Sequence, residues 1–130
     1  MQIFLAMILA VSVCSFCFSR INPNGVGTGC GSHISLFVHM MQSERDDVLQ
    51  WPFTGRRISL SILDQSDDGE DKRHISKTFV TQPNTPAFER PPTPVNQHGY
   101  GYEEFCHQDI LQDRYVKNGS LVVKIKVENN

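Results

Sequence analysis

Two stretches in the middle of the chain alternate apolar and polar side chains residue by residue. In residues 34–41 the apolar row is made of Ile34, Leu36, Val38 and Met40. In residues 58–63, Ile58, Leu60 and Ile62 alternate with two serines. A period of two is typical of half-buried β-strands. Residues 75–80 and 121–127 read as further strands, and no long helical period is present. The chain is therefore predicted to be all-β, with an antiparallel β-sandwich as its fold.

The segment between the first two strands carries a hydrophobic anchor, Trp51-Pro52-Phe53. Pro52 fixes its own φ and drives Trp51 towards an extended conformation, so the segment is not the interior of a helix. Trp51 is the only tryptophan of the chain. Its large apolar surface predicts that it covers one end of the core, and we interpret all three residues as structural rather than ligand-binding.

Two loops are indicated by composition. Residues 22–31 contain four glycines and are followed by a β-like run instead of a helix, which favours a hairpin over a phosphate-binding loop. Residues 82–95 contain five prolines, which predicts an extended surface connection.

Charge and cysteine content exclude several functional classes. The 130 residues suffice for one domain, and a net charge of -2 without a basic stripe argues against nucleic acid as a partner. Cys14 and Cys17 form a C-x-x-C pair that lacks the second half of a zinc site. The five histidines show neither metal nor catalytic spacing. We expect no metal, no cofactor and no catalytic residue, and hence no enzyme.

Residues 1–19 contain no charged side chain. They could form a signal peptide, although the usual basic start is missing, or a marginal membrane span, or they could be an artefact of the gene model. The localisation expected is cytoplasmic, and the alternative is a secreted or membrane-anchored chain.

Near the end of the chain, Gly99-Tyr100-Gly101-Tyr102 places two aromatic rings beside two glycines. Glycine permits the close approach of another backbone, and tyrosine offers rigid contact area with a polar tip. The pattern suits an edge strand that accepts a peptide as an added strand. It suits equally well a pair of tyrosines that pack on their own loop.

Several of these motifs together resemble a known family. The stretches HISLFVHMMQ, WPF, LSILDQ, AFERPPTP, GYGYEEF and LVVKIKVE occur in the order found in the MATH (TRAF-C) domain of the TNF-receptor-associated factors, and they resemble the factor-6 branch most. The resemblance covers residues 20–130, which we expect to form a MATH domain that is incomplete at its N-terminus, because the family has further strands before the position of Arg20.

The resemblance implies an adaptor that binds short peptides of the type Pro-x-Glu-x-x-aromatic or acidic, from receptor tails or signalling proteins. The positions that match the family's peptide site are Arg20, Phe37, Phe79, His98, Gly99, Tyr100, Gly101 and Tyr102. Phe79 stands where the vertebrate pattern has methionine, and His98 stands where it has lysine.

The family also has a RING, zinc fingers and a trimerising coiled coil, which have no counterpart in these residues. Two alternatives stay open. The chain could be an extracellular MATH module of a secreted protein, or the C-terminal part of a TRAF-type ubiquitin ligase.

Overall fold

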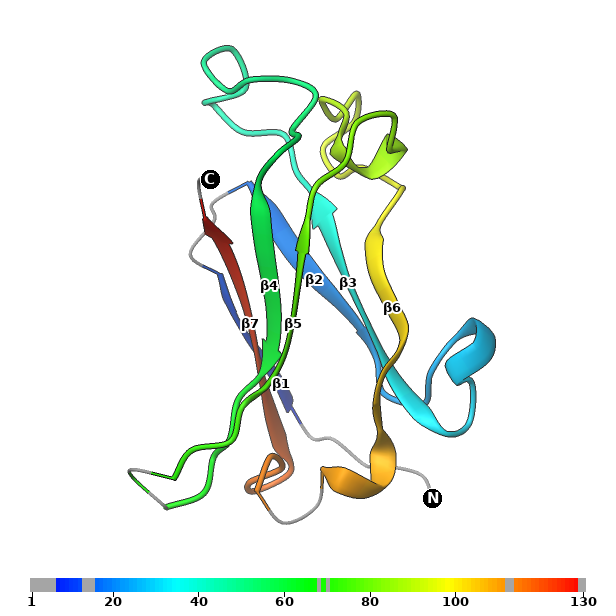
Figure 1. Cartoon of the computed structure of the whole chain (residues 1–130), viewed down its shortest axis with the longest axis vertical. Helices are drawn as coiled ribbons and strands as arrows, with labels where there is room; N and C mark the ends of the chain where they lie inside the picture. The colour runs from blue at the N-terminus through cyan, green and yellow to red at the C-terminus, as the bar shows by residue number, and fades with distance from the viewer. Residues whose placement is uncertain (1–6, 13–15, 68, 70, 112–113, 129–130) are drawn as a thin grey trace.

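The computed structural model describes residues 7–12, 16–67, 69, 71–111 and 114–128, and for residues 7–12 it describes the backbone only. The described residues form seven strands in two sheets (Figure 1). The strands are β1 (Met7–Ser12), β2 (Cys17–Asn22), β3 (His33–Met40), β4 (Arg57–Ile62), β5 (Ile75–Val80), β6 (Tyr100–His107) and β7 (Ser120–Glu128). Three short 3₁₀ turns complete the structure: η1 (Gly27–Gly29), η2 (Pro86–Phe88) and η3 (Gln108–Ile110).

One sheet has the order β1-β7-β4-β5 and the other the order β2-β3-β6. All neighbouring strands run antiparallel except β1 and β7, which are parallel. The predicted antiparallel β-sandwich is therefore confirmed, and one parallel pair is added to it. Strands β5 and β6 each end their sheet, and this arrangement positions the candidate site described below.

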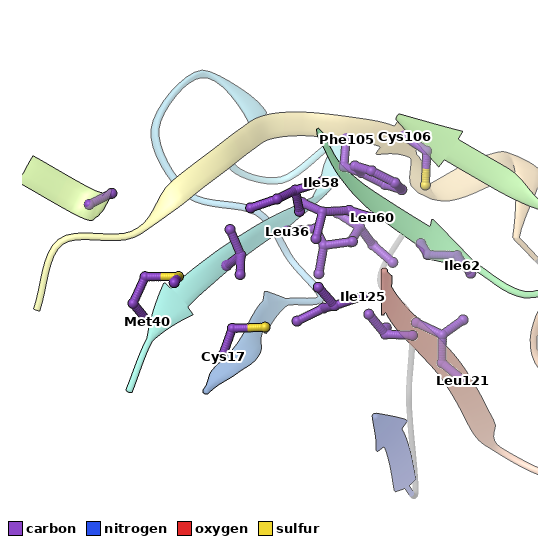
Figure 2. Packing of buried hydrophobic residues seen from close by; sticks show 14 of the residues in the cluster. Cys17, Leu36, Met40, Ile58, Leu60, Ile62, Phe105, Cys106, Leu121 and Ile125 are labelled. Carbon is purple, nitrogen blue, oxygen red and sulfur yellow. The ribbon is translucent and has the colours of Figure 1, made fainter. Parts of the chain in front are cut away.

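The core lies between the two sheets (Figure 2) and is built from the alternating apolar rows that the sequence shows. Core residues with an exposed fraction of only 0–2% are Ile34, Leu36, Val38, Met40, Ile58, Leu60, Ile62, Leu121, Val123 and Ile125. Lys124 and Lys126 alternate with the buried residues of β7, as expected for an outer face.

Strand β3 differs from the half-buried strand that the alternation predicted. Its polar residues Ser35 and His39 are also buried, at 0% and 6% exposure. Ser35 is covered by the loop after β2 and by β6, because its Oγ accepts the N–H of Val26 at 2.9 Å and donates to the carbonyl oxygen of Glu103 at 2.7 Å. The ring of Phe18 stacks on His39, and the backbone at Gly99 packs against the same imidazole.

The hydrophobic anchor packs against the margin of the core. Phe53, not Trp51, is the fully buried member, with 2% exposure. Trp51 is only partly buried at the margin of the core, and its Nε1 donates a hydrogen bond to the carbonyl oxygen of Asp46 at 3.0 Å. Pro52 follows Trp51 through a cis peptide bond and is exposed.

The N-terminal part of the described chain contributes two strands. Strand β2 begins at Cys17, three residues before Arg20, and its side-by-side pairing with β3 closes the predicted glycine-rich hairpin through η1. Strand β1 pairs with β7 of the other sheet. The described residues contain no helix with the length and apolarity needed to cross a bilayer. Cys106 is a buried free thiol and Cys30 an exposed one, Cys17 is buried, and Cys14 lies outside the described residues.

A buried carboxylate holds the loops at the far end of β4. Asp64 accepts hydrogen bonds from the backbone N–H of Ser66 at 2.8 Å, from that of Arg73 at 2.9 Å and from Arg114 Nε at 2.9 Å. Burial alone would raise the pKa of Asp64, but these hydrogen bonds outweigh it and hold the pKa well below its ordinary value. The carboxylate therefore joins three segments in its ionised form.

Candidate functional site

The candidate site lies where the two edge strands face each other across the sandwich. The ring of Phe79 on β5 lies 4.7 Å from that of Tyr100 and 6.3 Å from that of Tyr102 on β6 (centroid distances). Tyr100 remains 37% exposed. Among the described strands β6 has a hydrogen-bonded neighbour on one side only, namely β3. An edge of this kind presents unpaired backbone groups to which an extended peptide can bind.

The register of β6 on β3 sorts the predicted residues onto two faces of the sheet. Tyr100 lies opposite Val38 and Tyr102 opposite Leu36, so both tyrosines are on the core side, at its rim. Gly101 lies opposite Phe37, whose side chain is on the outer face, because directly opposed residues share a face. The residues expected to form one site thus lie on both faces of the sheet.

On the outer face, β2 places Arg20 opposite Phe37. The guanidinium carbon of Arg20 lies 4.4 Å from the centroid of the Phe37 ring, which is a cation–π contact. Arg20 Nε also donates a hydrogen bond to Nε2 of His39 at 3.0 Å. The structure therefore brings Arg20 and Phe37 together and leaves the other nitrogens of this exposed guanidinium facing solvent or Asn22.

His39 connects this outer face to the loop that precedes β6. Its Nδ1 lies 2.9 Å from the carbonyl oxygen of Asn96, and the Asn96 side chain accepts the backbone N–H of His98 at 2.9 Å. A carbonyl oxygen can only accept, and Arg20 can only donate. Both bonds are satisfied together when His39 is neutral and carries its proton on Nδ1, so the imidazole orients Arg20 and the loop at once.

The two glycines of the motif are required by packing within this chain. A Cβ at Gly101 would lie 2.1 Å from the carbonyl oxygen of Leu36, and a Cβ at Gly99 would lie 2.4 Å from His39 Nε2. At Gly101 the closely approaching group is the backbone of β3, and at Gly99 it is the imidazole of His39. That these glycines also admit the backbone of a ligand stays a prediction.

His98 is exposed at the start of the edge and, with Pro92, Thr93, Asn96 and Gln97, lines a shallow hollow. The eight predicted residues therefore fall into a ring cluster (Phe79, Tyr100 and Tyr102), an outer pair (Arg20 and Phe37), two supporting glycines and His98 at one end. Within the described residues, no group of three or more His, Cys, Asp or Glu side chains is placed to hold a metal ion.

Two residues of this region had no role assigned from the sequence. They are His39, which lies between the apolar residues of the strand predicted at 34–41, and Lys77, which lies in the strand predicted at 75–80. The signal for Lys77 is its position between Ile75 and Phe79 in the row of β5 that points inward. A charged residue within such a row needs a specific partner.

Comparison with known proteins agrees with this architecture. Residues 16–124 match the sequence profile of the TRAF/meprin MATH domain. TNF receptor-associated factor 6-A of Xenopus laevis is 44% identical over 99 residues, which cover 75% of this chain and 17% of that protein. TNF receptor-associated factor 6 of Homo sapiens is 42% identical over 99 residues, which cover 75% of this chain and 19% of that protein.

Among solved structures, TRAF5 of Notothenia coriiceps superposes with a TM-score of 0.77 and 32% sequence identity, covering 88% of this chain and 56% of that one. The chain spans 17–19% of the length of the two curated relatives. The fold, the matched profile and these relatives lead to one conclusion. This chain belongs to the TRAF/meprin MATH domain family.

Proposed function

We propose that this chain is a peptide-binding adaptor module that docks short Pro-x-Glu-type motifs, from receptor tails or signalling proteins, along the edge of β6. The observation that carries this proposal is the exposed ring of Tyr100, which stands on an open strand edge and packs 4.7 Å from Phe79 of the facing edge strand. Aromatic side chains that are held rigidly and left partly exposed are typical anchors for a ligand.

A peptide that adds as a strand to β6 pairs its backbone with the edge, and its alternate side chains then lie on opposite faces. On the core side, Tyr100, Tyr102 and Phe79 offer an apolar surface suited to proline. On the outer side, the exposed guanidinium of Arg20 offers a cation for an acidic or aromatic side chain. His98 lies at the start of the edge and adds a polar contact there.

The wider role follows from the names and lengths of the relatives. They are named for association with the TNF receptor, and this chain corresponds to a small part of their length. We therefore place the module in TRAF-type signalling in the cytoplasm. Ubiquitin transfer and trimerisation, which the family resemblance connects with a RING and a coiled coil, are not part of the function proposed for these residues.

Calorimetric titration of the chain with a synthetic peptide that contains Pro-x-Glu-x-x-aromatic tests the proposal. We expect Tyr100→Ala to weaken binding by about 30-fold, which corresponds to the roughly 2 kcal/mol commonly lost when an aromatic anchor is truncated. Val48→Ala is the control, since Val48 is 78% exposed and lies outside the ring cluster. Equal affinity of the Tyr100→Ala variant and the parent, with both folded, contradicts the proposal.

A further inference from the structure

Strand β5 carries a lysine where its alternation calls for an apolar side chain. Ile75, Lys77 and Phe79 share the half-buried face of β5, whereas Ser76, Thr78 and Val80 are exposed. Charged residues that point inward from an edge strand are one of the devices that keep a sheet edge from pairing with another chain. Lys77 is placed to act in this way, but on the edge of the opposite sheet.

The ammonium group of Lys77 crosses from β5 to β6. Its Nζ lies 4.9 Å from the centroid of the Tyr102 ring and 5.6 Å from that of Phe105. It then donates a hydrogen bond to the backbone carbonyl oxygen of Glu104 at 3.3 Å. The stem of the side chain thus lies against aromatic rings while the charge is satisfied at the strand backbone.

The carbonyl of the neighbouring residue is occupied as well. The Oγ of Ser35 on β3 donates a hydrogen bond to the carbonyl oxygen of Glu103 at 2.7 Å. Ser35 belongs to the strand that is already paired with β6, so this bond holds the Glu103 carbonyl on the β3 side. The acceptor that a ligand strand would lose to Lys77 is the carbonyl of Glu104. The side chains of Glu103 and Glu104 are exposed in addition, so the same stretch repels an acidic ligand.

We propose that Lys77 is a specificity-determining residue that ends the docking edge of β6 at Tyr102, so that a bound peptide pairs with residues 99–102 and with nothing beyond them. This inference rests on the proposed function and adds a limit to the length of the recognised segment. Residues of the ligand that extend past Tyr102 meet an occupied acceptor and an ammonium group instead of free backbone.

The test compares peptides of two lengths on the full chain. One peptide has the Pro-x-Glu-x-x-aromatic core. A second adds four alternating threonine and valine residues at the N-terminus of this core, and a third adds them at its C-terminus. For the parent we expect extension to change the Kd by less than about twofold. For Lys77→Met we expect one of the extended peptides to bind about tenfold more tightly than the core, because strand pairing continues along the freed edge. Methionine keeps an unbranched apolar stem against the rings.

Lys124→Met is the matched control, because Lys124 lies on the outer face of β7 and its loss removes one charge far from the β6 edge. Amide hydrogen exchange at residues 103–107 provides a second readout, with new protection by the extended peptide in Lys77→Met alone. A gain from extension in the parent, or no gain and no new protection in Lys77→Met, overturns the inference. Absence of core-peptide binding in every protein, the Lys124→Met control included, overturns the proposed function and this inference with it.

Discussion

Arg20 donates a hydrogen bond of 3.0 Å to His39, and this single contact connects the cation of the outer face to a buried imidazole of β3. The other ring nitrogen of His39 is bonded to the carbonyl oxygen of Asn96, in the loop that leads into β6. The orientation of Arg20 and the start of the edge strand therefore depend on the same neutral side chain.

His39→Phe removes both hydrogen bonds while keeping a ring of similar size. Two polar groups then lose their partners, of which the carbonyl of Asn96 is buried, and an unsatisfied buried polar group costs about 1–3 kcal/mol. We expect a loss of this size in the free energy of unfolding, measured with denaturant. His98→Ala is the control, because the exposed His98 side chain has no such burial, and its loss should stay within about 0.5 kcal/mol. Equal effects of the two substitutions would contradict the role given to His39.

Gly101→Ala introduces a Cβ 2.1 Å from the carbonyl oxygen of Leu36. Because that atom belongs to the backbone of β3, β6 has to shift, and overpacking of this kind costs about 1–3 kcal/mol. We expect a lower thermal midpoint and weaker peptide binding in the same variant. Gly69→Ala serves as the control, since among the described residues no heavy atom outside its chain neighbours lies within 4 Å of the added Cβ. A variant with the thermal midpoint of the parent would show that β6 has room to move at no cost.

Phe53→Ala is expected to destabilise the protein more than Trp51→Ala. Phe53 is 2% exposed, and truncation of such a phenylalanine costs about 3–5 kcal/mol. Trp51 is only partly buried and loses one hydrogen bond, to the Asp46 carbonyl. Denaturant unfolding followed by circular dichroism measures both variants without relying on tryptophan fluorescence. The reverse order would place the anchor at Trp51 after all.

Asp64 predicts the response of the fold to acid. Its pKa is lowered in the folded state, so its contribution to stability is complete above the unfolded value of about 3.8 and is lost as the pH falls below it. Asp64→Asn removes this titration, so the unfolding free energy of the variant should fall less steeply between about pH 4 and pH 2. Asp47→Asn is the control, because Asp47 forms only an exposed ion pair with Arg90. If the unfolding free energies of Asp64→Asn and the parent fall with the same slope between about pH 4 and pH 2, ionised Asp64 does not stabilise the fold.

His98→Lys restores the residue that the vertebrate pattern has at this position. His98 is exposed at the start of the edge proposed to dock the peptide, where a positive charge would favour the acidic residue of a Pro-x-Glu motif. We expect binding to become a few-fold tighter at low salt and this gain to shrink as salt is added, in calorimetric titrations at two ionic strengths. A gain that salt leaves unchanged would mean that the lysine acts through packing rather than charge.

The strand pattern was predictable because each strand has one apolar row. The limits expected for the strands at 34–41, 58–63 and 121–127 differ from the observed β3, β4 and β7 by one residue at either end, and β5 matches at both ends. The fold class followed from the same rows and from the family resemblance. Local alternation determines which face of a strand is apolar, and this information is contained in consecutive residues.

The remaining features depend on contacts between residues far apart in the chain. His39 is buried by Phe18 and Gly99, which are 21 and 60 residues away from it in sequence. The contact of Lys77 with β6 exists only because β5 and β6 face each other at the ends of their sheets. The choice of Phe53 over Trp51 as the buried anchor likewise depends on how the loop meets the core, which composition does not determine.

If a peptide docks as proposed, the register of β6 on β3, with Gly101 opposite Phe37 and the tyrosines opposite core residues, directs its alternate side chains towards two separate sets of residues. Side chains at alternate positions of the peptide would contact Tyr100 and Phe79, and those at the intervening positions would contact Arg20 and Phe37. The two sets share no residue of this chain. Substitutions in one of these sets would change which residues are tolerated at every second position of the motif. The intervening positions would keep their preferences. Duplicated copies of such a domain can therefore acquire new partners in two stages. In each stage one half of the recognised motif changes while the other half is kept.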